Sequence, residues 1–141
     1  MPGLGGLNVW ALPLAALVSF VFGAIWYMAL SRPWREASDI DSSGPAASPP
    51  PATLVATYLA QLVMAWVFAQ LLLNLGRGGI AVSSTSGIVI GAGLWAGLIL
   101  MPLFVNNMYQ GAKRALTLID GAHWLGVMIV QGALLGAFAI R

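Results

Sequence analysis

The sequence predicts an all-α fold, an integral membrane bundle of four spanning helices. Hydrophobic residues make up 60% of the chain and charged residues 7%, whereas a soluble domain has roughly 45–50% apolar residues. The mean hydropathy of +0.89 indicates that lipid is the natural solvent for most of the chain. The apolar residues also fall into four stretches, each near the length of about 20 residues that crosses a bilayer.

The four expected spans form a single membrane domain. They cover about residues 7–30, 53–75, 85–107 and 117–140. The segment from Met1 to Asn8 has no Lys or Arg, so it lacks the positive leader of a secretory signal, and we expect the first span to be retained.

The connections between the spans are polar. Residues 31–52 hold charged residues first and then Ser, Gly and Pro, a composition that predicts a flexible, partly extended linker on the cytoplasmic side. The second connection opens with Gly76-Arg77-Gly78-Gly79, which is a strong helix stop.

Basic residues predict the orientation. The first and third connections carry four of them, Arg32, Arg35, Lys113 and Arg114. The opposite side carries two, Arg77 and Arg141. Because cytoplasmic loops are enriched in Lys and Arg, we expect a multi-pass protein of the bacterial inner membrane with both termini on the periplasmic side.

Small residues recur every four positions on three of the spans. They are Ala15, Ser19 and Gly23 on the first, Gly87, Gly91, Gly93 and Gly97 on the third, and Gly132 and Gly136 on the fourth. Such residues let helix backbones approach closely in lipid. We expect them to pack the bundle, and the same faces would also serve a homo-oligomer or a larger membrane complex.

Aromatic and proline positions add detail to the spans. Pro102 is expected to kink the third span about one turn before its end. Most Trp and Tyr residues fall near predicted span ends, which is typical of the aromatic belt at a membrane surface. They are Trp10, Trp26, Tyr27, Trp34, Tyr109 and Trp124. Trp66 and Trp95 lie deeper, where we expect them to pack in the bundle or against lipid.

A polar stripe on the fourth span gives the candidate site. Asp120, His123 and Gln131 share one face of a helix, and lipid would penalise that face, so it should point into the bundle. The site is expected to join them to three residues near the same membrane side, Tyr27, Asn106 and Asn107. Such a pocket can hold a cation, a polar headgroup or a proton.

A structural interpretation of the same residues stays open. Thr117 and Asp120 have the spacing of an N-terminal capping pair, and Lys113 or Arg114 is close enough in sequence to neutralise the carboxylate. His123 would then be a buried imidazole that hydrogen-bonds Asp120 or a backbone carbonyl.

The chain lacks the residues that several kinds of functional site require. The chain has no Cys and one His, so it falls short of the three or four ligands that zinc takes. It has no Gly-x-Ser-x-Gly motif and no phosphate-binding loop. Six Lys and Arg against four acids do not make a nucleic-acid surface. We therefore expect no metal, cofactor, nucleic-acid partner or enzymatic activity, and membrane lipid as the principal partner.

Short motifs near the ends of the spans resemble a known family. They are Asn8 and Trp10, the run Gly23-Ala24-Ile25-Trp26-Tyr27 followed by Trp34, then Asn106, Asn107, Tyr109 and Gly111, and finally Leu118-Ile119-Asp120-Gly121-Ala122-His123. This pattern is similar to the domain-of-unknown-function 1761 group of small four-span bacterial membrane proteins. The family usually has Pro soon after the Trp-Tyr pair, whereas here Met28 and Ala29 follow and the linker is long. The resemblance implies four helices and no established activity.

Three functional hypotheses follow. The first is a membrane protein that binds a small polar or ionic ligand, or a lipid headgroup, near the cytoplasmic end of the bundle. The second is an accessory or scaffold subunit of a larger membrane complex, which acts through its small-residue faces. The third is a minimal proton-coupled transporter that works as an oligomer and uses Asp120 and Gln131.

Overall fold

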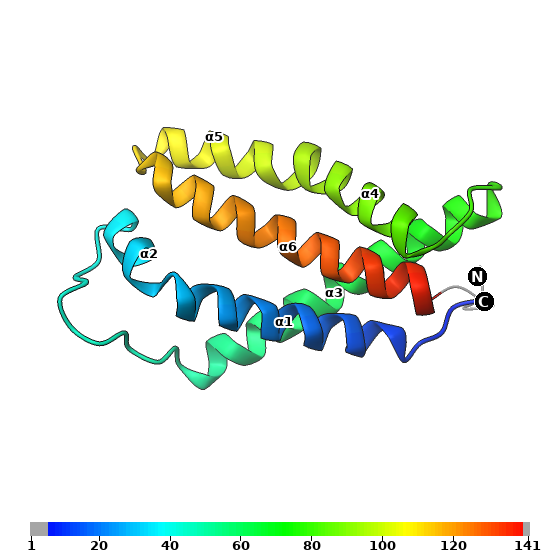
Figure 1. The fold of residues 1–141 in the computed structure, drawn as a ribbon, viewed down its shortest axis with the longest axis horizontal. Coiled ribbons are helices and arrows are strands. Elements are labelled where there is room, and N and C mark those ends of the chain that lie inside the picture. The colour runs from blue at the N-terminus through cyan, green and yellow to red at the C-terminus, as the bar shows by residue number, and fades with distance from the viewer. Residues whose placement is uncertain (1–5, 140–141) are drawn as a thin grey trace.

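Residues 6–139 are the part of the chain that this computed structural model describes, and they form helices without strands. The elements are α1 (Ala11–Ala29), α2 (Ser31–Ala37), α3 (Pro51–Arg77), α4 (Ser84–Leu94), the π-helix η1 (Trp95–Leu100), α5 (Met101–Tyr109) and α6 (Arg114–Phe138). Four stretches are long and apolar enough to cross a membrane: α1, α3, the continuous run of α4, η1 and α5, and α6. The predicted all-α fold with four spans is confirmed (Figure 1).

The helices begin and end at recognisable signals. Pro51 is the first residue of α3, where its missing N–H costs no hydrogen bond. Past the end of α3, Gly79 takes a positive φ of 91°, which favours glycine. Ser83 and Ser86 form a reciprocal capping box at the start of α4. The fourth span starts at Arg114 rather than near residue 117, and this shift changes the interpretation of Asp120.

The first connection differs from the expected flexible linker. Its first residues form α2, which is separated from α1 by Leu30 alone. The irregular part of the connection covers residues 38–50. Helix α2 lies at the same end of the molecule as the start of α6 (Figure 1). An isolated seven-residue helix is marginal in water, so α2 draws added stability from hydrogen bonds within its own segment, such as those from Arg35 to Asp41 and Gly44, and from its contacts with the bundle.

The third span contains a π-helical segment at the place where a proline kink is expected. Residues Trp95–Leu100 form η1, and Pro102 follows within the first two residues of α5. Short π-helical segments inside α-helices are rare and frequently mark functional positions. Here η1 carries Trp95, whose indole Nε1 donates to the backbone oxygen of Gly121 at 2.8 Å.

Helices α4 and α6 are in direct backbone contact through glycines. A Cβ built on Gly87 would lie 2.0 Å from the backbone oxygen of Gly132, and one on Gly132 would lie 2.3 Å from that of Gly87. Gly91 meets Met128 and Gly136 meets Ser83 in the same way, with the added Cβ 2.6 Å and 2.2 Å from the partner's backbone oxygen. Only glycine permits so close an approach, as expected for helices that associate in lipid.

Two glycines that were expected to pack do not. Gly93 and Gly97 are exposed, and a Cβ on either would have no atom within 4 Å. Their neighbours Val89 and Leu98 are also exposed, at 65% and 70%. Four-residue spacing therefore marked two faces of the third span, of which only the face bearing Gly87 and Gly91 meets another helix of this chain.

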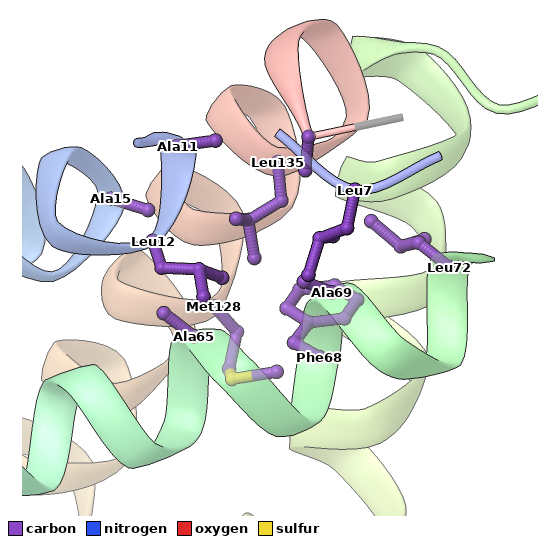
Figure 2. Packing of buried hydrophobic residues seen from close by; sticks show 11 residues of the cluster. Leu7, Ala11, Leu12, Ala15, Ala65, Phe68, Ala69, Leu72, Met128 and Leu135 are labelled. Atoms are coloured by element: carbon purple, nitrogen blue, oxygen red, sulfur yellow. The ribbon is translucent and has the colours of Figure 1, made fainter. Parts of the chain in front are cut away.

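The apolar core joins α1, α3 and α6 near the described ends of the chain. Leu7 lies over Phe68, Ala69 and Leu72 of α3 (Figure 2). Leu135 of α6 is fully buried in the same cluster. The backbone N–H of Asn8 donates to the oxygen of Ala139 at 2.8 Å, and this bond ties the segment before α1 to the end of α6.

Candidate functional site

Asp120 lies in the second turn of α6, about 9 Å along the axis from Arg114 at the usual rise of 1.5 Å per residue. Its Oδ1 accepts a hydrogen bond from the Tyr27 hydroxyl at 2.7 Å and another from Trp34 Nε1 at 3.1 Å. Both donors are neutral. Within the described residues Asp120 makes no ion pair, so its negative charge is hydrogen-bonded but not neutralised by a cation.

Three tryptophans from three elements donate to three consecutive residues of α6. Trp26 of α1 donates from Nε1 to the backbone oxygen of Ile119 at 3.2 Å. Trp34 of α2 donates to the side chain of Asp120, and Trp95 of η1 donates to the backbone oxygen of Gly121 at 2.8 Å. Because indoles combine an apolar body with one N–H donor, they fix this turn of α6 from three sides without adding charge.

His123 lies one turn beyond Asp120 and is enclosed by rings. Its ring centroid is 4.7 Å from that of Tyr27, 4.9 Å from Trp124 and 6.1 Å from Phe22. The side chain is buried, and its Nδ1 has no hydrogen-bond partner among the described residues. The expected bond from His123 to Asp120 or to a backbone carbonyl is absent there.

The missing side chain of Gly23 on α1 leaves the space that this imidazole occupies. A Cβ built on Gly23 would lie 2.7 Å from His123 Nε2, which is closer than real Cβ atoms pack. The first-span glycine that was expected to contact another helix backbone therefore contacts a ring instead.

The capping interpretation of Asp120 is wrong. Because α6 begins at Arg114 with Lys113 as its N-cap, Asp120 is too far along the helix to cap it. Lys113 turns away from Asp120, and its Nζ bonds Asp39 and the backbone oxygen of Glu36.

The two asparagines lie apart from the carboxylate. Asn107 is buried and its Nδ2 donates to the Thr117 hydroxyl at 2.9 Å, so it joins α5 to α6 without bonding Asp120. Asn106 is exposed. Neither belongs to the hydrogen-bond set around Asp120, although both lie in the expected third span.

Gln131 belongs to a second, separate polar cluster. Its Nε2 lies 3.1 Å from Ser19 Oγ and 3.0 Å from Gln61 Oε1, while Ser19 Oγ donates to Gln61 Oε1 at 3.0 Å. All three side chains are fully or almost fully buried, and the Oε1 of Gln131 has no hydrogen-bond partner within residues 6–139. This cluster joins α1, α3 and α6 about 16 Å along α6 from Asp120.

Sequence reasoning missed four contributors to these clusters. Trp26 and Trp34 were expected in an aromatic belt, Trp95 in general packing, and Gln61 was not singled out. An amide inside a long apolar run was a usable signal for Gln61. No sequence signal shows which acceptor an indole N–H will find.

The apolar helices and their arrangement define a multi-pass, all-α membrane protein. The sequence profile of one family, described as a protein of unknown function (DUF1761), matches residues 10–136. The chain belongs to this family, as the resemblance of its short motifs implied. No curated protein and no solved structure matches it.

Proposed function

We propose that the protein binds a small organic ammonium ion at Asp120. The observation that carries this proposal is the hydrogen bonding of Oδ1 by two neutral donors, Tyr27 and Trp34, with no cation paired to the carboxylate among the described residues. An ionisable side chain within a membrane span carries a free-energy cost, which reaches roughly 2.5–3.5 kcal/mol at the helix centre. A bound cation would neutralise the carboxylate.

The chemistry around Asp120 suits an ammonium group. Oδ2 makes no hydrogen bond within the described part of the chain, while a carboxylate can accept about four. An ammonium donates up to three. The ring of Tyr27, whose hydroxyl donates to Oδ1, also attracts a cation that lies against its face.

The depth of Asp120 favours a ligand from the aqueous side over a lipid. The carboxylate is about 9 Å along α6 from Arg114, below the level of the basic residues. In a phospholipid the ammonium lies farther from the acyl chains than the phosphate does. A lipid ammonium would therefore have to fold inward to reach Asp120, whereas a water-borne ammonium has no acyl chains that fix its depth.

The test uses ethylammonium chloride and the whole protein in nanodiscs of phosphatidylglycerol, a lipid without an ammonium. Titration calorimetry should give saturable binding to the wild type and none to Asp120→Asn, whose carboxamide oxygen still accepts from Tyr27 and Trp34. Asp41→Asn is the matched control, because Asp41 is an exposed carboxylate at the same end. Equal binding by wild type and Asp120→Asn would refute the proposal.

A second arm separates the two sources of the ammonium. Phosphatidylethanolamine is added to the same nanodiscs and retained lipid is measured by native mass spectrometry. Retention that depends on Asp120 and that prevents ethylammonium binding would identify the lipid headgroup as the occupant. Ethylammonium binding that is unchanged by this lipid supports a water-borne ligand.

The proposal includes an orientation. Lys113 and Arg114 lie at the same end as Arg32 and Arg35 of α2, and such residues concentrate on the cytoplasmic side. The site would then open to the cytoplasm of a bacterial cell, with both termini periplasmic. Because the chain has no Cys, a Ser42→Cys variant should react with an impermeant maleimide in inverted inner-membrane vesicles and not in intact spheroplasts.

A scaffold or accessory-subunit role is the second candidate. One observation favours it: Gly93 and Gly97 lie on an exposed face, where a Cβ built on either would have no atom of the described residues within 4 Å. Two residues suited to close packing then meet no helix in the described part of the chain. Under this hypothesis Gly97→Leu abolishes assembly with a homo-oligomer or a partner subunit, while Asp120→Asn is tolerated. Native mass spectrometry of both variants distinguishes the two roles.

A further inference from the structure

We infer that α2 is a hinged lid over Asp120, latched by Lys113, and that it controls entry of the ligand. This inference rests on the proposed function, since it describes how the same site is opened. Three features carry it: a single hinge residue, an internally bonded segment, and two polar anchors to the bundle.

Leu30 is the hinge. It is both the C-cap of α1 and the N-cap of α2, with φ −105° and ψ 19°, outside helical values. One residue is enough to change the direction of the chain between two helices, and hinges commonly consist of a few positions at element ends. On its other side α2 leads into the irregular residues 38–50, and the side-chain bond from this stretch to the start of α6 is the exposed pair of Asp39 with Lys113.

The segment from α2 to Gly44 is bonded to itself. Arg35 Nη1 donates to the backbone oxygens of Asp41 at 3.1 Å and Gly44 at 2.8 Å. Arg32 pairs with Glu36 inside α2 at 2.9 Å. These bonds stay intact if the segment rotates about Leu30, so it can move as one body.

Only two polar anchors join this segment to the rest of the described chain. The first is Trp34 Nε1 on Asp120 Oδ1 at 3.1 Å. The second is Lys113, whose Nζ donates to the backbone oxygen of Glu36 at 2.8 Å and bonds the carboxylate of Asp39. The side chains of Lys113 and Asp39 are 53% and 77% exposed, and exposed ion pairs are weak. The latch is therefore easily released.

The first anchor couples the lid to the ligand. Trp34 donates to Oδ1 of the carboxylate that the ammonium would bind, and its ring contacts that of Tyr27, the other donor to this oxygen. Binding of a cation neutralises the charge that strengthens the indole bond. Ligand binding and lid closure therefore oppose each other. The apparent affinity for the ligand equals the affinity of the open form multiplied by the fraction of molecules that are open.

The test combines a distance measurement with the ethylammonium titration. Spin labels at Ile40→Cys and Gln110→Cys, both exposed, report the separation of the lid segment from the α5–α6 turn by pulsed electron paramagnetic resonance. Asp39→Asn removes the ion pair of the latch, keeps the bond from Lys113 to the backbone oxygen of Glu36 and does not touch Asp120. It should add a population at longer distance. It should also tighten ethylammonium binding by up to about fivefold, the limit for a weak exposed pair. Ethylammonium should itself lengthen the distance in the otherwise unmodified protein.

Two comparisons make the outcome decisive. Asp41→Asn changes a side chain of the same segment that bonds only Ser43 among the described residues, so it should leave the distance distribution unchanged. An unchanged distribution in Asp39→Asn and in Trp34→Phe, with ethylammonium still bound, overturns the lid and leaves the proposed function standing. A longer distance in Asp39→Asn without any ethylammonium binding establishes the movement of α2 and overturns the proposed function together with the inferred control of entry.

Discussion

Gly23 and His123 meet where α1 crosses α6, and the ring nitrogen Nε2 takes the space that a side chain at Gly23 would fill. Gly23 opens the run that ends at Tyr27, and His123 closes the run that contains Asp120. Two short motifs about a hundred residues apart in sequence therefore build one site. The glycine sets how near the helices come, and that distance lets Tyr27 reach Asp120 at 2.7 Å.

Replacement of Gly23 by Ala should destabilise the protein and disturb the site together. The added Cβ would lie 2.7 Å from His123 Nε2, so the ring must move, at a cost of about 1–3 kcal/mol for an overpacked position. Unfolding in mixed micelles of increasing dodecyl sulfate fraction measures the loss. Gly93→Ala is the control, because open space surrounds Gly93 and alanine favours a helix. Equal stability of wild type and Gly23→Ala would contradict the packing described.

Replacement of Gly87 or Gly132 by Ala should have a larger effect. Each new Cβ would meet backbone atoms of the opposite helix, at 2.0 Å and 2.3 Å, and backbone cannot move aside as a side chain can. We expect a loss at or above the upper end of the range of about 1–3 kcal/mol. The same unfolding assay applies, and a loss no greater than that of Gly93→Ala would show that α4 and α6 are not in backbone contact.

The buried amide cluster predicts a non-additive pair of mutations. Gln131→Leu leaves Gln61 Oε1 without its amide donor, and hydrogen bonds between membrane helices contribute about 0.6 kcal/mol on average and up to about 1.7. Adding Gln61→Leu removes the acceptor that lost this donor as well, so the double variant should lose less stability than the sum of the two single variants. Strict additivity in a double-mutant cycle would argue against the contact.

One carboxylate outside the membrane spans has a predictable titration. The side chain and backbone N–H of Ser43 both donate to Asp41 and hold its pKa below the ordinary value. Because the pKa of Asp41 is lower in the folded protein than in the unfolded chain, its ionised carboxylate stabilises the fold at pH values above the ordinary pKa. This stabilisation is lost as the pH falls through the lowered pKa. Ser43→Ala should raise the pKa of Asp41, as measured by carbon-13 nuclear magnetic resonance of the carboxyl group. An unchanged value would show that the hydroxyl is not bonded to Asp41.

The candidate site was predictable in part. Asp120, His123 and Tyr27 stand out in sequence because polar groups in an apolar chain must find partners, and the structure brings these three together. Asn106, Asn107 and Gln131 share their membrane side or helix face, yet the structure places none of them on Asp120. Periodicity tells which residues share a face, and it does not tell which neighbouring helix covers each part of that face.

By itself the sequence determined the fold class and the number of spans, because the membrane solvent imposes length and hydropathy on each helix separately. It also marked glycines as packing residues. Only the tertiary structure decided that Gly87 packs and Gly93 does not, that Gln131 bonds Gln61, and that Trp34 on α2 reaches Asp120. Those outcomes depend on the rotation and separation of helices far apart in sequence, which no single segment specifies alone.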